Sequence, residues 1–468
     1  MILEPLFEQF LNKSAISVMA RATIEHALSA SALDKLFDRT AQSGYTRELL
    51  FSSLVDLMCL VVSGKALHVQ SAFQQIRDQI PVTLKSVYEK LQRLEPQVAA
   101  ELVRHVAGRS QGLIEALGGT CQSLLPNYRV RILDGNHLAA TQKRLKVTRQ
   151  HKAGPMPGQC LAVLDPALAV ITDVIPCEDA HAQERALLEQ VLPLVRAGDV
   201  WIADRNFCTA DFLCSLQQEQ ACFVLRRHSN LTVQPQKEFG PEVETETGWA
   251  SEQPVWVCRD GEGLLQTRLV RLRLKKPTED GDEEILLLSN LPGEAADAAK
   301  VSGLYLKRWK VEGAFYELTM TLQCEVNTLG YPKAALFAFC VAVSAYNVLA
   351  VVKAALRAVH GEERVEKEVS GYYVALEWSL VYAGMMIALP PEGWKVFGEM
   401  ATQELAGYLR EWASKVNMLK IKKAPPRKPT KNKTKRDKDA SPHLSTARLL
   451  EEAKSEGKKR SEKRNKSL

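Results

Sequence analysis

Residues 304–318 read LYLKRWKVEGAFYEL and form the most informative stretch of the chain. If this stretch is helical, Tyr305, Arg308 and Glu312 share one face, since they stand at positions i, i+3 and i+7, and Trp309 lies at its edge. Arginine can bind two phosphate oxygens at once, glutamate can hold a divalent cation, and tyrosine or tryptophan can stack on a base. The pattern also fits an amphipathic helix with a merely solvated polar face, so the interpretation depends on the residues upstream.

Two aspartates upstream each follow an apolar run that is typical of a strand. Asp134 ends the run YRVRILD and Asp204 ends the run VWIAD. In open α/β sheets, ligands are held at the carboxyl ends of the strands. Nearby acids have local explanations; Asp165, for example, precedes Pro166 in a predicted turn. Asp134 and Asp204 are therefore the predicted site acids.

The spacing of apolar residues between positions 128 and 228 predicts a definite order of elements. Strands are expected at 128–134, 159–165, 168–176, 200–207 and 222–227, and helices at 181–192 and after Thr209. The predicted order is therefore three strands, a helix, a strand, a helix and a strand. This order predicts an α/β fold with a ribonuclease H-like core, which is a mixed sheet flanked by helices.

This arrangement predicts a metal site. The first and fourth strands are neighbours in such a sheet, so Asp134 and Asp204 are expected to lie close together, with Glu312 delivered by a later helix. Three carboxylates supply the hard oxygen ligands that Mg²⁺ or Mn²⁺ prefers. Two such ions about 4 Å apart can activate a nucleophile and stabilise the leaving oxygen of a displacement at phosphorus. Asp134, Asp204 and Glu312 are thus the predicted catalytic and metal-binding residues.

Composition and pattern divide the chain into five parts. We expect a helical domain, the first part of the core, a β-rich insertion that splits the core, the second part of the core with the catalytic helix and further helices, and a disordered basic tail. The helical domain is interpreted as DNA-end-binding only because of the motifs that follow it. These parts are 1–120, 121–228, 229–297, 298–414 and 415–468. In the first part, the helix after Thr83 fits either the recognition helix of a helix-turn-helix or an ordinary bundle helix.

Charge is distributed unevenly. Residues 415–468 hold 19 Lys and Arg against 6 Asp and Glu, a net +13, so the rest of the chain sums to −7. The tail therefore fits either a solubilising segment or a non-specific contact with the DNA backbone. The 10 cysteines contain no CxxC pair, and no signal peptide is evident, so we expect a reduced, cytoplasmic protein associated with the nucleoid.

One apolar run, at residues 334–352, approaches the length of a membrane span. Ser344, Tyr346 and Asn347 interrupt it and Lys353 follows it. A helix buried against the sheet is the preferred interpretation, and no membrane is expected as a partner.

These motifs resemble those of bacterial insertion-sequence DDE transposases of the IS-four-like group, whose last catalytic helix carries Tyr-x-x-Arg-x-x-x-Glu. Here that motif is YLKRWKVE, from Tyr305 to Glu312. The second-acid motif of the group stands as Asp204-Arg205-Asn-Phe and the first as Asp134-Gly-Asn-His. The resemblance covers roughly residues 10–415.

The resemblance implies cut-and-paste transposition by two-metal phosphoryl transfer, in which the element's ends are nicked and the freed 3′-OH attacks target DNA. It implies inverted-repeat ends and target DNA as partners, Mg²⁺ or Mn²⁺ as cofactor, and a dimer in the synaptic complex. Asp134, Asp204 and Glu312 would be the catalytic triad, with DNA contacts from Tyr305, Arg308, Trp309 and Arg205. Basic residues soon after Asp134 fit either DNA-backbone contacts or a solvated loop: Lys143, Arg144, Lys146, Arg149 and Lys152.

The sequence departs from the group at one position. A lysine expected seven residues after Glu312 is replaced by Thr319. That phosphate contact, and with it a hairpin intermediate on the excised end, is therefore not predicted. Two alternatives remain open: a domesticated or inactive transposase-derived protein that only binds DNA, and a ribonuclease H-like nuclease.

Overall fold

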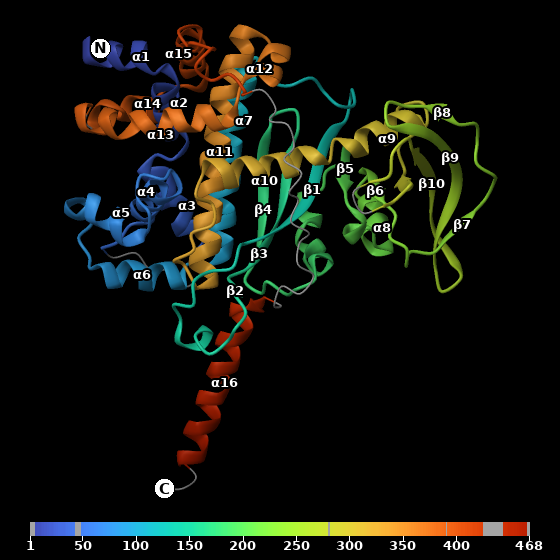
Figure 1. The fold of residues 1–468 in the computed structure, drawn as a ribbon, viewed down its shortest axis with the longest axis horizontal. Helices are drawn as coiled ribbons and strands as arrows, with labels where there is room; N and C mark the ends of the chain where they lie inside the picture. Colours follow the sequence, from blue (N-terminus) through green and yellow to red (C-terminus); the bar gives the residue numbers. More distant parts are fainter. Residues whose placement is uncertain (1–4, 43–47, 279–280, 390, 425–442, 466–468) are drawn as a thin grey trace.

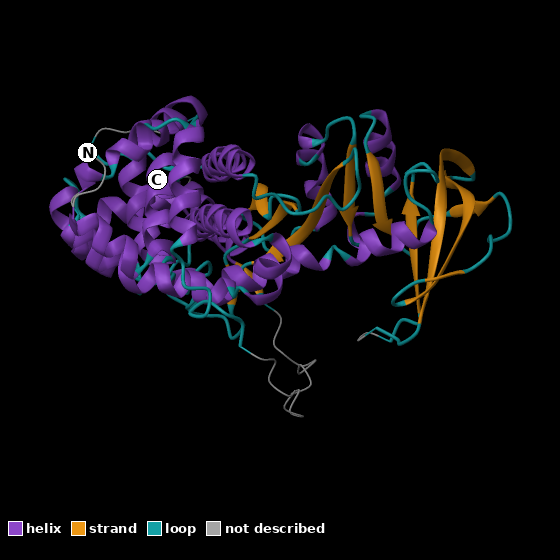
Figure 2. Ribbon diagram, turned by 90° about the horizontal axis from the view of Figure 1, so that it is seen from above, coloured by secondary structure: helices purple, strands orange, loops and turns teal. Residues whose placement is uncertain are grey.

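The computed structural model describes residues 5–42, 48–278, 281–389, 391–424 and 443–465. Helices cover both faces of a central mixed sheet. Figure 1 shows the largely helical part and the β-rich part at opposite ends, with α9 and α10 running between them. Figure 2, seen from above, shows the same division, with strands concentrated away from the helical mass.

The strands of the described residues are the following. They are β1 (Arg129–His137), β2 (Pro155–Met156), β3 (Gln159–Asp165), β4 (Val170–Cys177), β5 (Asp199–Ala203), β6 (Cys222–Arg226), β7 (Val233–Pro235), β8 (Val243–Glu244), β9 (Gly248–Arg259), β10 (Glu262–Leu274), β11 (Glu284–Ser289) and β12 (Leu444–Ser445).

The α-helices are α1 (Pro5–Lys13), α2 (Ala15–Ala27), α3 (Ala30–Thr40), α4 (Phe51–Val62), α5 (Val69–Gln75), α6 (Leu84–Arg93), α7 (Pro96–Leu117), α8 (Ala210–Gln218), α9 (Ala298–Leu306), α10 (Trp309–Thr321), α11 (Pro332–His360), α12 (Glu362–Glu368), α13 (Gly371–Ala388), α14 (Lys395–Glu399), α15 (Thr402–Ser414) and α16 (Thr446–Asn465). Short 3₁₀ helices are η1 (Arg77–Gln79), η2 (Lys146–Thr148), η3 (Glu184–Gln190), η4 (Leu192–Leu194), η5 (Arg205–Phe207) and η6 (Pro391–Gly393).

The sheet runs in the order β4-β3-β1-β5-β6-β11-β10-β9-β7. β1, β5 and β6 are parallel neighbours, whereas β3 and β4 continue the sheet antiparallel on the other side of β1. The five strands predicted between positions 128 and 228 are thus all present, and β1 and β5, the first and fourth of them, pair as expected. The domain boundaries drawn from the sequence stay predictions.

The helix predicted at 181–192 is wrong in type. This segment forms the 3₁₀ helices η3 and η4 instead of one α-helix. Pro193 has no N–H to donate, so it cannot extend a helix through this point. The apolar side chains still pack inward: Leu187 and Leu188 join the core that α8 shares with the sheet.

The β-rich insertion extends the central sheet. β11 pairs antiparallel with β6, and β10 and β9 follow it as a long hairpin. An Asp-Gly pair favours a hairpin turn, and the hairpin turns at Asp260 and Gly261, which both have positive φ angles, 52° and 87°. The insertion therefore lies in line with the core strands.

The two faces of the sheet have separate cores. Along β1, Ile132 joins the larger core with α7 and α11, and its neighbour Leu133 joins the core with α8. Alternation along β1 thus fixes which helices cover which face of the sheet.

In the N-terminal part, α6 begins as predicted, since the Thr83 side chain accepts a hydrogen bond from the backbone N–H of Ser86.

Helix α11 contains the long apolar run. Among the described residues it is the one helix that is long and apolar enough to cross a membrane, and its most apolar window is wholly buried inside the protein. Asn347, which interrupts the run, accepts from the backbone N–H of Ile171 (3.0 Å) and donates to its carbonyl oxygen (2.8 Å). The polar residue therefore attaches α11 to the edge strand β4.

The prediction that the whole basic tail is disordered is wrong. Residues 425–442 lie outside the described residues, but α16 is a 20-residue helix that projects from the body in Figure 1. At its base β12 pairs with β2, and Arg448 donates to Asp179 at 3.0 Å. These contacts, together with a helix-favouring composition rich in Lys, Glu and Ala, order this part of the tail.

Candidate active site

The two predicted strand acids stand side by side in the sheet. The last parallel pair of β1 and β5 is Leu133 with Ala203, so the next residues in the two strands are Asp134 and Asp204. Asp204 follows β5, as predicted. Asp134 does not end its strand, because residues 134–137 continue the antiparallel pairing with β3. The predicted adjacency nevertheless follows from the register.

The third acid arrives on a broken helix. The predicted continuous helix over 304–318 is wrong, because α9 ends at Leu306 and α10 begins at Trp309. Tyr305 lies in the last turn of α9, Arg308 at the junction and Glu312 in the first turn of α10. Both helices pass over the strands that carry the aspartates (Figure 1).

Two side chains from this junction connect the three acids. The Tyr305 hydroxyl donates to Asp204 at 3.2 Å. Nη1 of Arg308 donates to Asp134 at 2.9 Å and lies 2.8 Å from Oε1 of Glu312. The sequence motif therefore converges with the strand acids in one place, although 101 and 174 residues separate the hydrogen-bonded partners.

The electrostatics of this site are strongly perturbed. Burial raises the pKa of Asp134 to about 6; Arg308 lowers it, and the charges of Glu312 and Asp204 raise it further. Burial, followed by the charge of Asp204, raises the pKa of Tyr305 to about 12. Burial opposes the charged form of Arg308, but its acidic neighbours outweigh that effect and raise its pKa. Asp134, Asp204 and Glu312 therefore lie within electrostatic reach of one another.

Whether these residues fit a metal ion can be judged from their contacts. The donor set of three carboxylates is right for Mg²⁺ or Mn²⁺. Nη1 of Arg308, however, is bonded to one oxygen of Asp134 and to one oxygen of Glu312. Among the residues that the structure describes, no three His, Cys, Asp or Glu side chains are arranged to hold a metal ion. The residues fit in chemistry, and Arg308 would compete with a cation for Asp134 and Glu312.

Other acids of the core are engaged in local ion pairs. Asp165 accepts from Arg131 at 2.6 Å and from two backbone N–H groups of its turn. Asp199 accepts two hydrogen bonds from Arg129, at 2.6 and 2.9 Å. Asp165 and Asp199 are therefore occupied by contacts within the fold. Asp134 and Asp204 remain the strand acids that face the helix junction.

Comparison with known proteins places this site in an enzyme class. Residues 125–348 match the family model described as the transposase DDE domain. This part of the chain is similar to transposase DDE domains. The enzyme class is accordingly that of a transposase, and the predicted resemblance to DDE transposases is confirmed at this level.

Further comparisons add no residue roles. A search of curated proteins found no match. Among solved structures, the chain is similar to a piggyBac transposase in a cryo-EM structure of a synaptic complex with hairpin DNA. The two share 11% identity over 87% of this chain and 86% of that one, with a TM-score of 0.39. A likeness at this level does not establish a common fold.

Two polar residues of the DDE domain escaped the sequence analysis. Glu184 packs directly against Gly135, the residue after Asp134: a Cβ atom added to Gly135 would lie 1.8 Å from Oε1 of Glu184. The other carboxylate oxygen of Glu184 accepts a hydrogen bond from Asn206 at 3.2 Å. Ala203 of β5 pairs with Leu225 of β6. The next residues, Asp204 and Arg226, therefore stand beside each other. The strand register was the signal that could have revealed Arg226; Glu184 had none, because η3 was expected to be an α-helix.

The predicted basic residues of the DDE domain lie on one loop between β1 and β2. Hydrogen bonds within the loop order it: Lys143 donates to the carbonyl of Lys152, and Arg149 to that of Arg144. Its 3₁₀ helix η2 packs against α16. Most of these residues are exposed: Arg144, Lys146, Arg149 and Lys152. The loop and the basic helix α16 thus form one neighbouring cationic surface.

The remaining candidates of the DDE domain lie at the surface near the acids. Trp309 is 58% exposed, and the guanidinium carbon of Arg308 lies 5.0 Å from its ring centroid. Arg205, directly after Asp204, is exposed. Both are thus accessible to a macromolecular ligand at the edge of the site.

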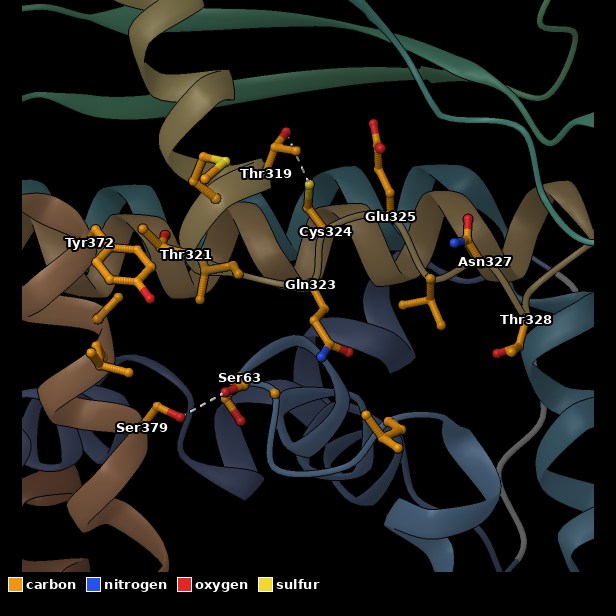
Figure 3. A pocket seen from close by; sticks show the side chains of 17 residues that line it. Ser63, Thr319, Thr321, Gln323, Cys324, Glu325, Asn327, Thr328, Tyr372 and Ser379 are labelled. Carbon is orange, nitrogen blue, oxygen red and sulfur yellow. Dashed lines mark hydrogen bonds between the residues drawn. The ribbon is translucent and has the colours of Figure 1, made fainter. Parts of the chain in front are cut away.

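Thr319 lies beyond the acids, at the mouth of a cavity of about 530 Å³ between the end of α10, α13 and the end of α4. Figure 3 shows its hydroxyl beside Cys324, and the two side chains are 3.9 Å apart. The same hydroxyl donates to the carbonyl of Phe315 at 3.0 Å, within its own helix. The residue at the position of the group's lysine therefore carries no charge toward the three acids.

Proposed function

We propose that this protein is a cut-and-paste transposase of the insertion-sequence group with the Tyr-x-x-Arg-x-x-x-Glu signature. It would nick the ends of its element and join the resulting 3′-OH to target DNA. The strand order, with three antiparallel and two further parallel strands, supports a ribonuclease H-like core split by the β-rich insertion.

One observation carries the proposal. Arg308 joins Asp134 to Glu312, while Tyr305 from the same junction binds Asp204. A structural ion pair would need one acid for one arginine, whereas this junction gathers three acids from three distant segments. Such gathering, with the raised pKa of Asp134, is typical of a site built for chemistry.

We infer that Asp134, Asp204 and Glu312 hold divalent cations, Mg²⁺ or Mn²⁺. A bound cation there would supply Lewis-acid stabilisation of charge at phosphorus and a more acidic attacking water. The bonds from Arg308 to Asp134 and Glu312 hold these carboxylates together before a cation arrives. Once displaced, its guanidinium would be free to bind two oxygens of a DNA phosphate.

The DNA contacts follow from position and charge. Tyr305, Arg308, Trp309 and Arg205 are assigned to the DNA near the reacting phosphate. Backbone contacts beyond it are assigned to the cationic loop: Lys143, Arg144, Lys146, Arg149 and Lys152. Since two element ends must meet for transposition, we propose that the protein acts as a dimer on DNA.

The test is cleavage and joining of the element's own ends in the presence of Mg²⁺. Asp134→Asn, Asp204→Asn and Glu312→Gln should each lower cleavage by at least about 10³-fold, since each removes a carboxylate from the site. Asp211→Asn, which changes an exposed acid on α8, is the matched control and should cleave normally. Normal cleavage by any site variant would remove that residue from the triad.

A second candidate rests on Thr319. Without the group's lysine, the protein could have kept end binding and lost cleavage, as a domesticated transposase-derived DNA-binding protein would. Binding of the element ends with no cleavage under Mg²⁺ or Mn²⁺ would select this alternative. A ribonuclease H-like nuclease would instead cut but never join strands.

A further inference from the structure

The side of α10 turned away from Asp134 borders a second cavity. It has a volume of about 270 Å³ and lies among α10, the last turns of α11, α12 and the segment that reaches Lys423. Lys310, Gly313 and Glu317 form its α10 wall, and they stand three and four residues apart, on one helical face. This cavity is separate from the cluster of Asp134, Asp204 and Glu312.

Cationic groups outnumber carboxylates in its lining. The cations are Lys310, Lys353, Arg357 and Lys423, and the acids are Glu317 and Glu366. Lys353 Nζ bonds to both oxygens of Glu317, so these two charges offset each other. The remaining charged residues of the lining are Lys310, Arg357 and Lys423 against Glu366, which leaves an excess of positive charge.

Arg357 is the buried cation of this cavity. Its side chain is 1% exposed; Nε donates to the carbonyl of Gly119 at 2.7 Å and Nη1 lies 3.3 Å from Glu366. Its Nη2 is buried and has no hydrogen-bond partner. A buried N–H group without a partner costs about 1–3 kcal/mol. An anion in the cavity would supply the missing acceptor.

Two lysines stand at the rim. Lys310 is exposed, and the structure shows no hydrogen bond or ion pair between its ammonium group and any other described residue. Lys423 is also exposed and donates to the backbone carbonyl of Glu366 at 2.6 Å, which leaves its charge unneutralised by a carboxylate. Both can therefore meet a charged ligand that enters from solvent.

We propose that this cavity binds a phosphate group, with Arg357 at its floor and Lys310 and Lys423 at its rim. The phosphate would come from a DNA backbone or from a free phosphate anion. The DNA form rests on the proposed function. Since Lys310 lies two residues before Glu312, a backbone phosphate held here would fix the position of the DNA relative to that acid.

The first arm of the test titrates inorganic phosphate into the full-length protein at low salt by calorimetry. The double variant Lys310→Ala/Lys423→Ala and the single variant Arg357→Lys should each bind phosphate roughly tenfold or more weakly, because a charged hydrogen bond is lost or misplaced. Lys300→Ala, a matched exposed lysine on α9, should bind as the parent does. If Arg357→Lys fails to fold, the exposed lysine pair still decides the result.

The second arm measures duplex DNA binding against salt concentration. Loss of one phosphate contact should reduce the slope of log K against log salt by about 0.9 in the double variant. Weaker phosphate binding with an unchanged slope assigns the cavity to a free phosphate anion. Unchanged phosphate binding overturns the proposal, even if DNA binding falls. Failure of end cleavage leaves the phosphate result intact, so the two proposals fail independently.

Discussion

Asp134 is the residue whose charge the protein perturbs most at the candidate site. Its side chain is 16% exposed and its pKa is raised to about 6, mainly by burial. A carboxylate whose folded pKa lies above its unfolded value of 3.8 destabilises the fold once the pH exceeds that value, and the cost is complete above about pH 6. The site thus lowers stability where its proposed function needs a charge.

This gives a signed prediction for Asp134→Asn in metal-free buffer. The variant should gain up to about 3 kcal/mol in unfolding free energy at pH 8, since two pKa units correspond to roughly that amount. The gain should shrink below pH 6 and fall to about 0.6 kcal/mol near pH 4, where the carboxyl is protonated in the folded protein and about half protonated in the unfolded chain. Urea unfolding with EDTA at both pH values measures it, and a pH-independent difference would contradict it.

Arg308 gives a second prediction at this scale. Because it occupies oxygens of Asp134 and Glu312, Arg308→Gln should bind Mn²⁺ more tightly than the parent in the absence of DNA. Cleavage should nevertheless fall, because the variant would lack the bidentate phosphate contact proposed for Arg308. Mn²⁺ titration followed by electron paramagnetic resonance tests this. Weaker Mn²⁺ binding would mean that Arg308 positions the acids instead of competing for them.

At the scale of single residues, the sequence could select some side chains of the candidate site and could not select others. Asp134, Asp204 and Glu312 could be selected because each ends an apolar run or belongs to a motif. Glu184 and Arg226 could not, because their approach to the site depends on the path of η3 and on the register of β6. Such contacts are made by the fold and leave no local pattern.

At the scale of elements, local chemistry predicted starts and turns better than helix type. The Thr83 cap and the Asp260–Gly261 turn are encoded by adjacent residues, and both were expected. The break between α9 and α10 and the 3₁₀ form of η3 were not. In both places the apolar periodicity of the sequence predicts one continuous α-helix, so it does not reveal the break or the 3₁₀ form.

The attachment of α11 to β4 gives a prediction at this scale. Asn347→Ala should cost about 2–4 kcal/mol of unfolding free energy, since it leaves a buried N–H and carbonyl of Ile171 without partners. Ser344→Ala is the matched control on the same helix. Its hydroxyl bonds only to the Cys340 carbonyl within that helix, so we expect a loss below about 1 kcal/mol. Equal losses in the two variants, measured by urea unfolding, would contradict this role.

At the scale of the whole molecule, the sheet joins the strands that position Asp134 and Asp204 to the β-rich insertion, and the cationic loop adjoins the basic helix α16. The sequence predicted the insertion and the positive tail. Because separate segments do not reveal their packing, it could not predict that β11 would pair with β6 or that α16 would contact η2.

The tail supplies the prediction at this scale. Truncation after residue 424 should reduce the slope of log K against log salt for duplex DNA by several units, because each lost phosphate contact contributes about 0.9. Stability of the body should change by less than about 1 kcal/mol, since the described contacts of α16 include an exposed ion pair to Asp179. An unchanged slope, measured by fluorescence anisotropy, would assign the tail to solubility.

The most direct test of the shared acid site is anomalous diffraction from crystals of the protein with an element end and Mn²⁺. The account predicts anomalous density bounded by the carboxylates of Asp134, Asp204 and Glu312, with the guanidinium of Arg308 moved onto a DNA phosphate. Density at a different place, with Arg308 still bridging Asp134 and Glu312 while the DNA is bound, would contradict it.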